Sequence, residues 1–272
     1  MTSLPQYIEV ETSRYCNRLC AWCPNSVIKD RKVQQLMDLH ILESILADLA
    51  QADYSGWLAF HNYNEPLANP RIFDEIRMTN ESVPDAKLAI YTNGDLLTQS
   101  AYQQLVDLGV KELRITRYPR PSQIDYYGLE QLTDWISERQ FLNKLTWLED
   151  GENHRGAVLY TETSHPKIIA IAPNVGGYYD RGGIIEELSG KRRVAPCKLT
   201  SHSLSIDYLG RVKMCCNIVP DANGHAEYVL GDVREEPALE VWRSAKFNDL
   251  RKLHLQADWR ASQLCATCTQ NI

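Results

Sequence analysis

The sequence contains no run of about 18 uncharged apolar residues, so it predicts no transmembrane helix. It has no basic excess either: 35 acidic and 29 basic residues give a net charge of −6, which argues against a nucleic-acid partner. The first five residues lack the basic start and apolar core of a signal peptide. No glycine-rich dinucleotide fingerprint or P-loop is present. We therefore expect a cytoplasmic protein without a membrane or nucleic-acid partner.

A long stretch without cysteine, residues 24–196, separates the eight cysteines of the 272-residue chain into two groups. A disulfide scaffold would spread its cysteines through a short chain, and a cytoplasmic protein keeps its thiols reduced. Metal or cluster binding is therefore the better interpretation. The groups are Cys16, Cys20 and Cys23 near the start, and Cys197, Cys215, Cys216, Cys265 and Cys268 near the end.

The first group places three thiols within eight residues, directly after a predicted strand at residues 7–12. Three thiolates suit a [4Fe–4S] cluster with one iron left open, because cubane irons normally take one thiolate each. An open iron is a coordination site for a substrate or cofactor. The alternative is a structural zinc site, which would need a fourth ligand nearby. The nearest histidine, His40, falls in a predicted helix well downstream.

Between the cysteine groups, strand-like runs alternate with helical periodicity. Such βα repeats predict an α/β fold with a parallel sheet or barrel of about six strands, and chemistry at the carboxyl ends of the strands. Further strands are expected at residues 57–60, 87–91, 112–116, 144–148 and 168–172, with helices at 38–50, from Pro70, at 98–108 and at 129–140.

The spacing CxxxCxxC after the first strand resembles the radical S-adenosylmethionine (SAM) superfamily. The resemblance implies a partial (β/α)6 barrel in which Cys16, Cys20 and Cys23 hold a [4Fe–4S] cluster whose open iron binds SAM. An electron from a donor such as flavodoxin or ferredoxin would then yield a 5′-deoxyadenosyl radical that abstracts hydrogen from carbon. Trp22 matches an aromatic residue that covers the cluster or adenine; the alternative is an aromatic side chain packed on the barrel.

The segment after the second predicted strand resembles the family's Gly-Gly-Glu-Pro motif. Tyr63 and Asn64 replace the usual glycines, so the match depends on Glu65 and the proline that follows. The resemblance implies that Asn64 and Glu65 hold the ammonium group of SAM. A plain turn before the next helix is the alternative.

Polar residues also follow the third and fourth predicted strands. Thr92 and Asn93 begin a turn suited to ribose hydroxyls, although Asn-Gly marks any tight turn. Thr116 and Arg117 end the fourth strand, and an arginine there could pair with the SAM carboxylate. A surface salt bridge is the alternative role for Arg117.

The C-terminal region resembles the SPASM or twitch extension of radical SAM enzymes. The matching features are an alternating hairpin at residues 203–214 between two cysteines, a Cys-Cys pair, the Leu-Gly-Asp-Val strand within 229–233, the segment 241–244 and a final CxxC. A helix is expected at 239–255. The resemblance divides the chain into a barrel over residues 1–188 and a small α+β domain over residues 189–272.

The five C-terminal cysteines are enough for one fully ligated auxiliary [4Fe–4S] cluster, with zinc as the alternative. The expected ligands are Cys197, Cys215, Cys265 and Cys268. A cluster with no open iron is suited to electron transfer. Cys216 is left over, as a small buried residue, a substitute ligand or a hydrogen-atom donor.

The segment around Arg181 locally resembles a small radical SAM dehydrogenase with one auxiliary cluster, which implies that Arg181 binds substrate between flexible glycines. The main hypothesis is dehydrogenation of a secondary alcohol on a small polar substrate, an aminocyclitol or sugar. An epimerase with Cys216 as hydrogen donor is the first alternative. A peptide-modifying enzyme is the second, disfavoured because only about six residues precede the first strand. The base stays open among His61, Glu149, His165 and His202.

Overall fold

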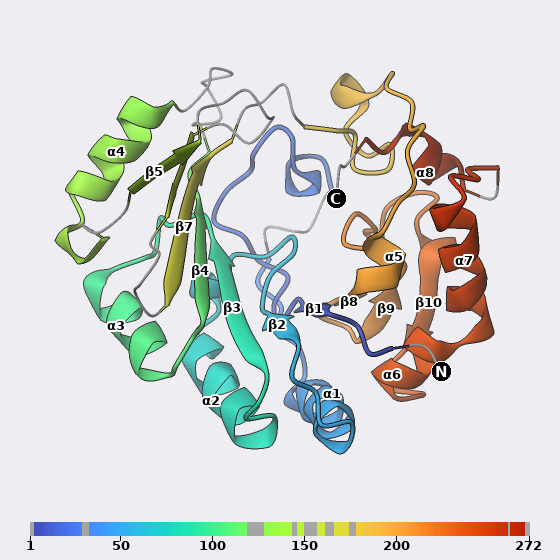
Figure 1. Cartoon of the computed structure of the whole chain (residues 1–272), viewed down its shortest axis with the longest axis horizontal. Coiled ribbons are helices and arrows are strands. Elements are labelled where there is room, and N and C mark those ends of the chain that lie inside the picture. Colours follow the sequence, from blue (N-terminus) through green and yellow to red (C-terminus); the bar gives the residue numbers. More distant parts are fainter. Residues whose placement is uncertain are drawn as a thin grey trace.

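The computed structural model describes residues 3–28, 33–118, 128–142, 146–149, 157–160, 166–173, 178–260 and 262–269. Within these residues the strands form one ten-stranded sheet in the order β10-β9-β8-β1-β2-β3-β4-β7-β6-β5. The sheet curves through the whole molecule, with most helices on its outer side (Figure 1). The expected α/β fold is confirmed.

Six neighbouring strands in the middle of the described sheet run parallel. Five of them match strands that the sequence predicted for the barrel, but the sixth does not. The expected strand at 144–148 is antiparallel to its neighbour, because residues 150–156 are too few for the crossover of about a dozen residues that parallel strands need. A strand from the C-terminal region, β8, completes the parallel set instead. The parallel strands are β1 (Tyr7–Val10), β2 (Trp57–Ala59), β3 (Lys87–Thr92), β4 (Glu112–Thr116), β7 (Lys167–Ala172) and β8 (Ser203–Ile206).

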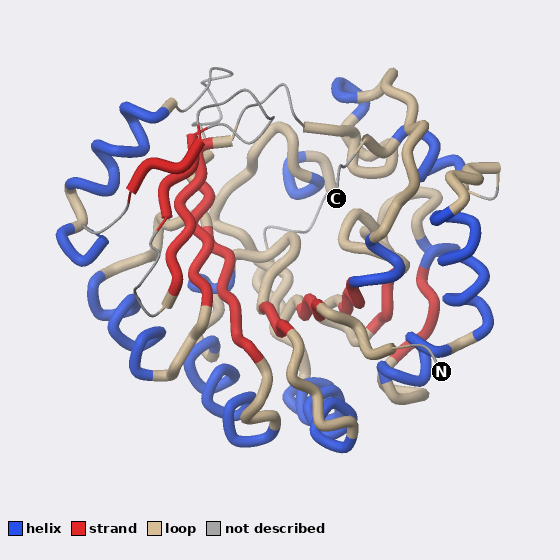
Figure 2. Tube along the Cα trace, in the orientation of Figure 1, coloured by secondary structure: helices blue, strands red, loops and turns tan. Residues whose placement is uncertain are grey.

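Antiparallel strands extend both sides of this parallel set. Figure 2 shows the strands of the sheet in red. The strand at residues 157–160, which pairs with β7, was not predicted from the sequence. The C-terminal hairpin expected at 203–214 is confirmed as β8 followed by β9. The added strands are β5 (Thr146–Glu149) and β6 (Ala157–Tyr160) beside β7, and β9 (Arg211–Lys213) and β10 (Val229–Asp232) beside β8.

Some of the helices begin where a side chain caps the first turn. Asp38 accepts a hydrogen bond from the His40 amide, and Thr98 accepts one from the Ala101 amide. The helix expected at 239–255 is two helices, because Ser244 is extended and caps the second one. The helices are α1 (Leu39–Gln51), α2 (Ile72–Ser82), α3 (Gln99–Asp107), α4 (Leu129–Ser137), α5 (Leu199–His202), α6 (Ala238–Arg243), α7 (Ala245–Leu255) and α8 (Gln263–Thr267).

The two faces of the sheet carry different side chains, because successive residues of a strand point to opposite faces. On β1, Ile8 and Val10 are fully buried in the hydrophobic core. Glu9 points to the other face, where it is in register with Ser205 on β8, which is in turn paired with Lys213 on β9. We call this other face the inner face. It is buried and polar, which marks it as a candidate site.

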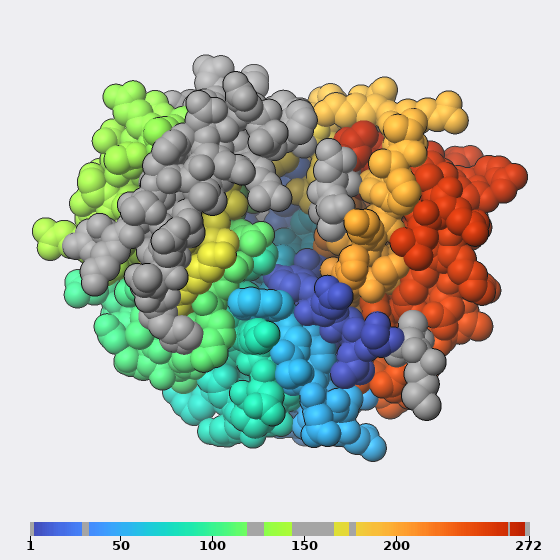
Figure 3. All heavy atoms as spheres, in the orientation of Figure 1, coloured from blue at the N-terminus to red at the C-terminus, as the bar shows by residue number. Residues whose placement is uncertain are grey.

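The space-filling view is hollowed between the N-terminal strands and the orange C-terminal segment (Figure 3). The carboxyl ends of the parallel strands lead toward this region in Figure 1. Among the described residues, no helix has both the length and the apolar character needed to cross a membrane.

Candidate active site and cluster sites

The loop after β1 carries the first three cysteines as free thiols. Burial, together with the nearby Cys23, raises the pKa of both Cys16 and Cys20 to about 12. The backbone turns tightly here, because the Cys23 amide donates to the Cys20 carbonyl over 2.9 Å. The structure therefore brings together three thiols that metal binding would deprotonate.

Trp22 packs inside a group of aromatic rings beside these thiols. Its indole stacks on Tyr178, with centroids 5.0 Å apart and planes 11° apart, and it lies 5.8 Å from the Tyr118 ring. The Trp22 Nε1 atom is buried and makes no hydrogen bond to the part of the chain that the structure describes. The residue thus links the cysteine loop to the segment that precedes Arg181.

Glu65 joins the ends of β2 and β3. Its carboxylate accepts hydrogen bonds from the Thr92 hydroxyl over 2.6 Å and from the backbone N–H of Asn93 over 2.7 Å. Burial raises the pKa of Glu65 to about 7. The Asn93 side chain donates to Asn17 over 2.7 Å and lies 4.0 Å from the Cys16 sulfur. Three residues singled out in the sequence therefore form one network beside the cysteine loop.

Asn64 and Thr116 are placed less decisively. Asn64 is buried and donates to the Ser13 hydroxyl over 3.5 Å, while its Oδ1 atom has no hydrogen-bond partner among the described residues. Thr116 ends β4, where it pairs with Ile171 and is half-buried. The roles predicted for both residues in binding SAM stay predictions.

Arg117 is held by an acidic residue that the sequence interpretation missed. Its guanidinium pairs with Asp95 at 2.8 Å and donates to the Asn93 carbonyl. Arg18 pairs with the same carboxylate at 2.6 Å. Although burial alone raises the pKa of Asp95, hydrogen bonds from Arg18 and Arg117 lower it to about 2. Asp95 directly follows the Thr92-Asn93-Gly94 turn, which was the available signal for its role.

Glu9 is the second residue that the sequence interpretation missed. Its Oε2 atom accepts hydrogen bonds from Ser205 over 3.2 Å and from Asn62 over 3.3 Å. Burial raises the pKa of Glu9 to about 7, although Lys213 lowers it. His61, a base candidate from the sequence, lies 3.7 Å from Glu9 Oε1. Burial lowers the pKa of His61 to about 3, so His61 is a weak base.

Two further cationic groups border the same space. Lys213 is fully buried, 3.6 Å from Glu11 Oε2. Arg181 has a left-handed backbone, with φ of 54°, and donates to Tyr179 Oη over 2.9 Å. Lys213 Nζ and Arg181 Nε are buried without a hydrogen bond to any described group. Arg181 Nε therefore suits a polar ligand, because a buried donor without a hydrogen bond is unfavourable, whereas Lys213 already has Glu11 as its ion-pair partner.

Cys216 lies close to groups of the inner face, and it is also near Cys268. Burial and the nearby Glu9 raise the pKa of its thiol, while Arg181 and Lys213 lower it. Cys216 does not line the pocket that the other four cysteines share. Of the remaining base candidates, His165 lies outside the described residues, and His202 ends α5.

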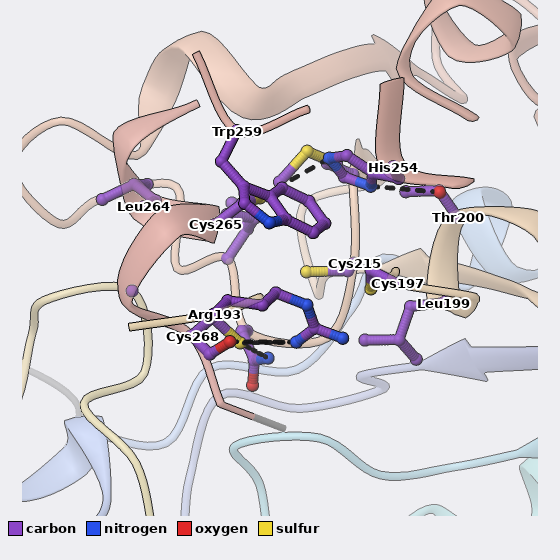
Figure 4. Close-up of a pocket in the computed structure, with 14 residues that line it drawn as sticks. Arg193, Cys197, Leu199, Thr200, Cys215, His254, Trp259, Leu264, Cys265 and Cys268 are labelled. Atoms are coloured by element: carbon purple, nitrogen blue, oxygen red, sulfur yellow. Dashed lines mark hydrogen bonds between the residues drawn. The ribbon is translucent and has the colours of Figure 1, made fainter. Parts of the chain in front are cut away.

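One pocket in the C-terminal region is lined by Cys197, Cys215, Cys265 and Cys268, the four cysteines that the sequence groups together (Figure 4). His254 Nε2 lies 3.5 Å from the Cys265 sulfur, and Arg193 lies 4.0 Å from the Cys268 sulfur. No three His, Cys, Asp or Glu side chains in the described ranges could hold one metal ion. A cubane does not require that, because it distributes its thiolates over separate irons.

The donor sets fit iron–sulfur clusters at both places. Three free thiols share one loop, and four free thiols surround one pocket. Thiolates are the usual protein ligands of such clusters.

Comparisons with known proteins agree with this geometry. Residues 10–116 match the family model of the radical SAM superfamily, and residues 197–269 match SPASM, an iron–sulfur cluster-binding domain. The chain is a radical SAM enzyme. Its cofactors are SAM with its cluster and an auxiliary iron–sulfur cluster, as the sequence predicted. The assignment of individual ligands stays a prediction.

Two of the similar proteins span nearly all of this radical SAM enzyme. The S-adenosyl-L-methionine-dependent 2-deoxy-scyllo-inosamine dehydrogenase of Niallia circulans is 29% identical over 269 residues, which cover 98% of this chain and 94% of that protein. The crystal structure of BtrN in complex with AdoMet and 2-DOIA is 26% identical with a TM-score of 0.72, and covers 99% and 95%. Native anSMEcpe with bound AdoMet shares the fold, at 14% identity, a TM-score of 0.55, and coverage of 92% and 84%.

We expect the Glu65→Gln variant to bind SAM about 10- to 100-fold more weakly, because a hydrogen bond to a charged group contributes about 1.5–3 kcal/mol. The measurement is SAM affinity of the anaerobically reconstituted protein. Iron content should stay at the wild-type level. Glu75→Gln is a matched control, since Glu75 is equally buried but belongs to α2. Wild-type SAM affinity in Glu65→Gln would show that the assignment of Glu65 is wrong.

Proposed function

We propose that this radical SAM enzyme dehydrogenates a secondary alcohol on a small polar substrate of the aminocyclitol or sugar class. The observation that carries the proposal is the extent of the similarity to 2-deoxy-scyllo-inosamine dehydrogenase, which runs through both cysteine regions. The buried polar inner face supports it. Carboxylate, ammonium and guanidinium groups there would pair with substrate hydroxyl and amino groups that an apolar substrate lacks.

Cys16, Cys20 and Cys23 would hold the cluster that binds SAM, and the four cysteines of the C-terminal pocket would hold the auxiliary cluster. When bound, these groups supply a 5′-deoxyadenosyl radical that takes a hydrogen atom from the carbinol carbon, and an acceptor for one electron. A donor of the flavodoxin or ferredoxin class would reduce the first cluster.

The chain itself must accept the hydroxyl proton. Conversion of CH–OH to C=O releases one hydrogen atom, one proton and one electron. Glu9 is the group on the inner face best suited to the proton, because its pKa is raised to about 7 while that of His61 is lowered to about 3. Asn62 and Ser205 hold Glu9 Oε2, so Oε1 is the atom that would take the proton. Lys213 and Arg181 would orient the substrate hydroxyls.

The test is to incubate the reconstituted, reduced protein with SAM and 2-deoxy-scyllo-inosamine carrying deuterium on each ring carbon in turn. We expect a ketone product and one deuterium in 5′-deoxyadenosine from a single position. A panel of other aminocyclitols and sugars would follow. SAM cleavage without a ketone from any member of the panel would contradict the proposed reaction.

The position of Cys216 favours an epimerase as a second candidate, because its thiol lies near Glu9 and Arg181 and does not line the auxiliary pocket. An epimerase needs this thiol to return a hydrogen atom, whereas a dehydrogenase does not. We expect Cys216→Ser to form ketone within about threefold of the wild-type rate, since the Ser side chain is close in size. In heavy water the product carbon should carry no deuterium. An epimer with carbon-bound deuterium, absent from the Cys216→Ser reaction, would favour the epimerase instead.

A further inference from the structure

Asn217 lies between the segment that carries Arg181 and the four-cysteine pocket. The side chain is 3% exposed, and it directly follows the Cys-Cys pair. Its Oδ1 atom accepts hydrogen bonds from Arg181 Nη1 and from Tyr179 Oη, each over 3.1 Å. Its Nδ2 atom donates to the Cys268 sulfur over 3.6 Å. One amide group therefore contacts both regions.

The backbone of Asn217 contacts a second cysteine of the same pocket, since its backbone N–H donates a hydrogen bond to the Cys215 sulfur. Asn217 thus touches two of the four expected ligands, and its side chain also lines the pocket. Hydrogen bonds to ligand sulfurs stabilise the reduced, more negative state of a cluster, so they raise its reduction potential. A cation at the amide oxygen polarises the group and strengthens the N–H donor at its other end.

The Arg181 segment is anchored so that this contact is maintained. His225 Nε2 lies 3.0 Å from the Gly182 carbonyl, and the Asp180 side chain accepts from the Gly182 amide over 3.2 Å. Arg181 itself keeps a left-handed backbone, which is unfavourable for a residue with a side chain and persists where surrounding contacts impose it.

We infer that Asn217 is a positioning residue that couples Arg181 to the auxiliary cluster. The oxygen of its side-chain amide holds the guanidinium toward the inner face. The N–H that the same group donates to Cys268 makes the reduction potential of the cluster depend on the charge at Arg181. The inference rests on the proposed function in one respect, that Cys268 ligates an auxiliary cluster. In the proposed dehydrogenation that cluster would accept one electron from the substrate, and the coupling would then raise the affinity of the cluster for this electron.

The test is a double-mutant cycle on the reduction potential, measured without substrate by a spectroscopically monitored redox titration. The full-length protein with Cys16, Cys20 and Cys23 replaced by alanine provides the background, because only the auxiliary cluster then contributes. Asn217→Leu removes all three contacts of the side-chain amide at similar volume, and Arg181→Met removes the cation at similar length. We expect each substitution to shift the potential to a more negative value.

The coupling predicts that the two shifts are not additive. In the Asn217→Leu protein, Arg181→Met should change the potential by less than half of its effect in the protein with Asn217. His254→Phe is the matched control: His254 contacts a different cysteine of the pocket, Cys265, so its shift should add to that of Arg181→Met. Asn217→Asp, which retains the acceptor atom and loses the donor, replaces Asn217→Leu if that variant binds less iron.

A wild-type potential in an iron-replete Asn217 variant would overturn the inference. So would shifts of Asn217→Leu and Arg181→Met that add fully. Because these readings need no substrate, they are independent of whether 2-deoxy-scyllo-inosamine is converted, and failure of the proposed reaction would be recognised separately by the absence of ketone.

Discussion

Replacement of Cys16, Cys20 and Cys23 with alanine is expected to abolish cleavage of SAM and to remove about half of the bound iron. The wild-type chain should hold about eight irons if both clusters are complete cubanes. The three thiols share one loop, apart from the four that line the C-terminal pocket, so the loss of one set should leave the other. Iron and sulfide analysis and the yield of 5′-deoxyadenosine measure the two effects.

Cys216→Ala is the matched control for this experiment, because Cys216 is the one C-terminal cysteine outside the pocket lining. That variant should retain wild-type iron and SAM cleavage. A fully reconstituted wild type with about four irons or fewer, or with zinc, would contradict the two-cluster assignment.

Glu9→Gln is expected to lower the rate of ketone formation by about 10²–10⁴-fold, the usual contribution of a positioned base. Hydrogen abstraction needs no base, so deuterium should still enter 5′-deoxyadenosine. The ratio of 5′-deoxyadenosine to ketone should therefore rise. Glu75→Gln is the control, since Glu75 is a buried carboxylate that belongs to α2 and not to the inner face. An equal loss of ketone formation in both variants would mean that Glu9 supports the fold and does not act as the base.

The pH profile gives an independent test of Glu9. Burial raises its pKa to about 7, so the base form is minor at low pH and dominant above about 7. The wild-type rate should rise about tenfold per pH unit below 7 and level off above it. The titratable groups near Glu9 are Lys213 from β9, Glu11 after β1, His61 after β2, Cys216, Tyr7 from β1 and Tyr91 from β3. The Glu9→Gln rate should not show this rise.

The sequence predicted the elements whose signals are local. Asp38 and Thr98 are typical first residues of helices, and both cap a helix here. Cysteine spacing predicted two cluster sites, and the structure gathers four distant cysteines in one pocket. Glu65 and Asn93 follow different strands, yet they meet because parallel strands end at one edge.

The features that the sequence interpretation missed depend on contacts between distant segments. Glu9 alternates with Ile8 and Val10, which indicates a two-faced strand, but only strand order shows that Ser205 and Lys213 continue its row. The sequence around Asn217 does not distinguish it from other polar residues. Its role becomes visible only from its hydrogen bond with the distant Arg181. Likewise, the antiparallel direction of the strand at 146–149 follows from its short connection.

The pairing of β8 with β1 means that the barrel and the C-terminal region share a continuous sheet. A chain ended at residue 188 would expose the N–H and C=O groups of Tyr7–Val10 along an open edge, next to the cysteine loop. Open edges of this kind pair with other chains and promote aggregation. Recombination could therefore not replace the C-terminal region without disrupting the barrel. The first strand of this region is part of the sheet that positions the cysteine loop.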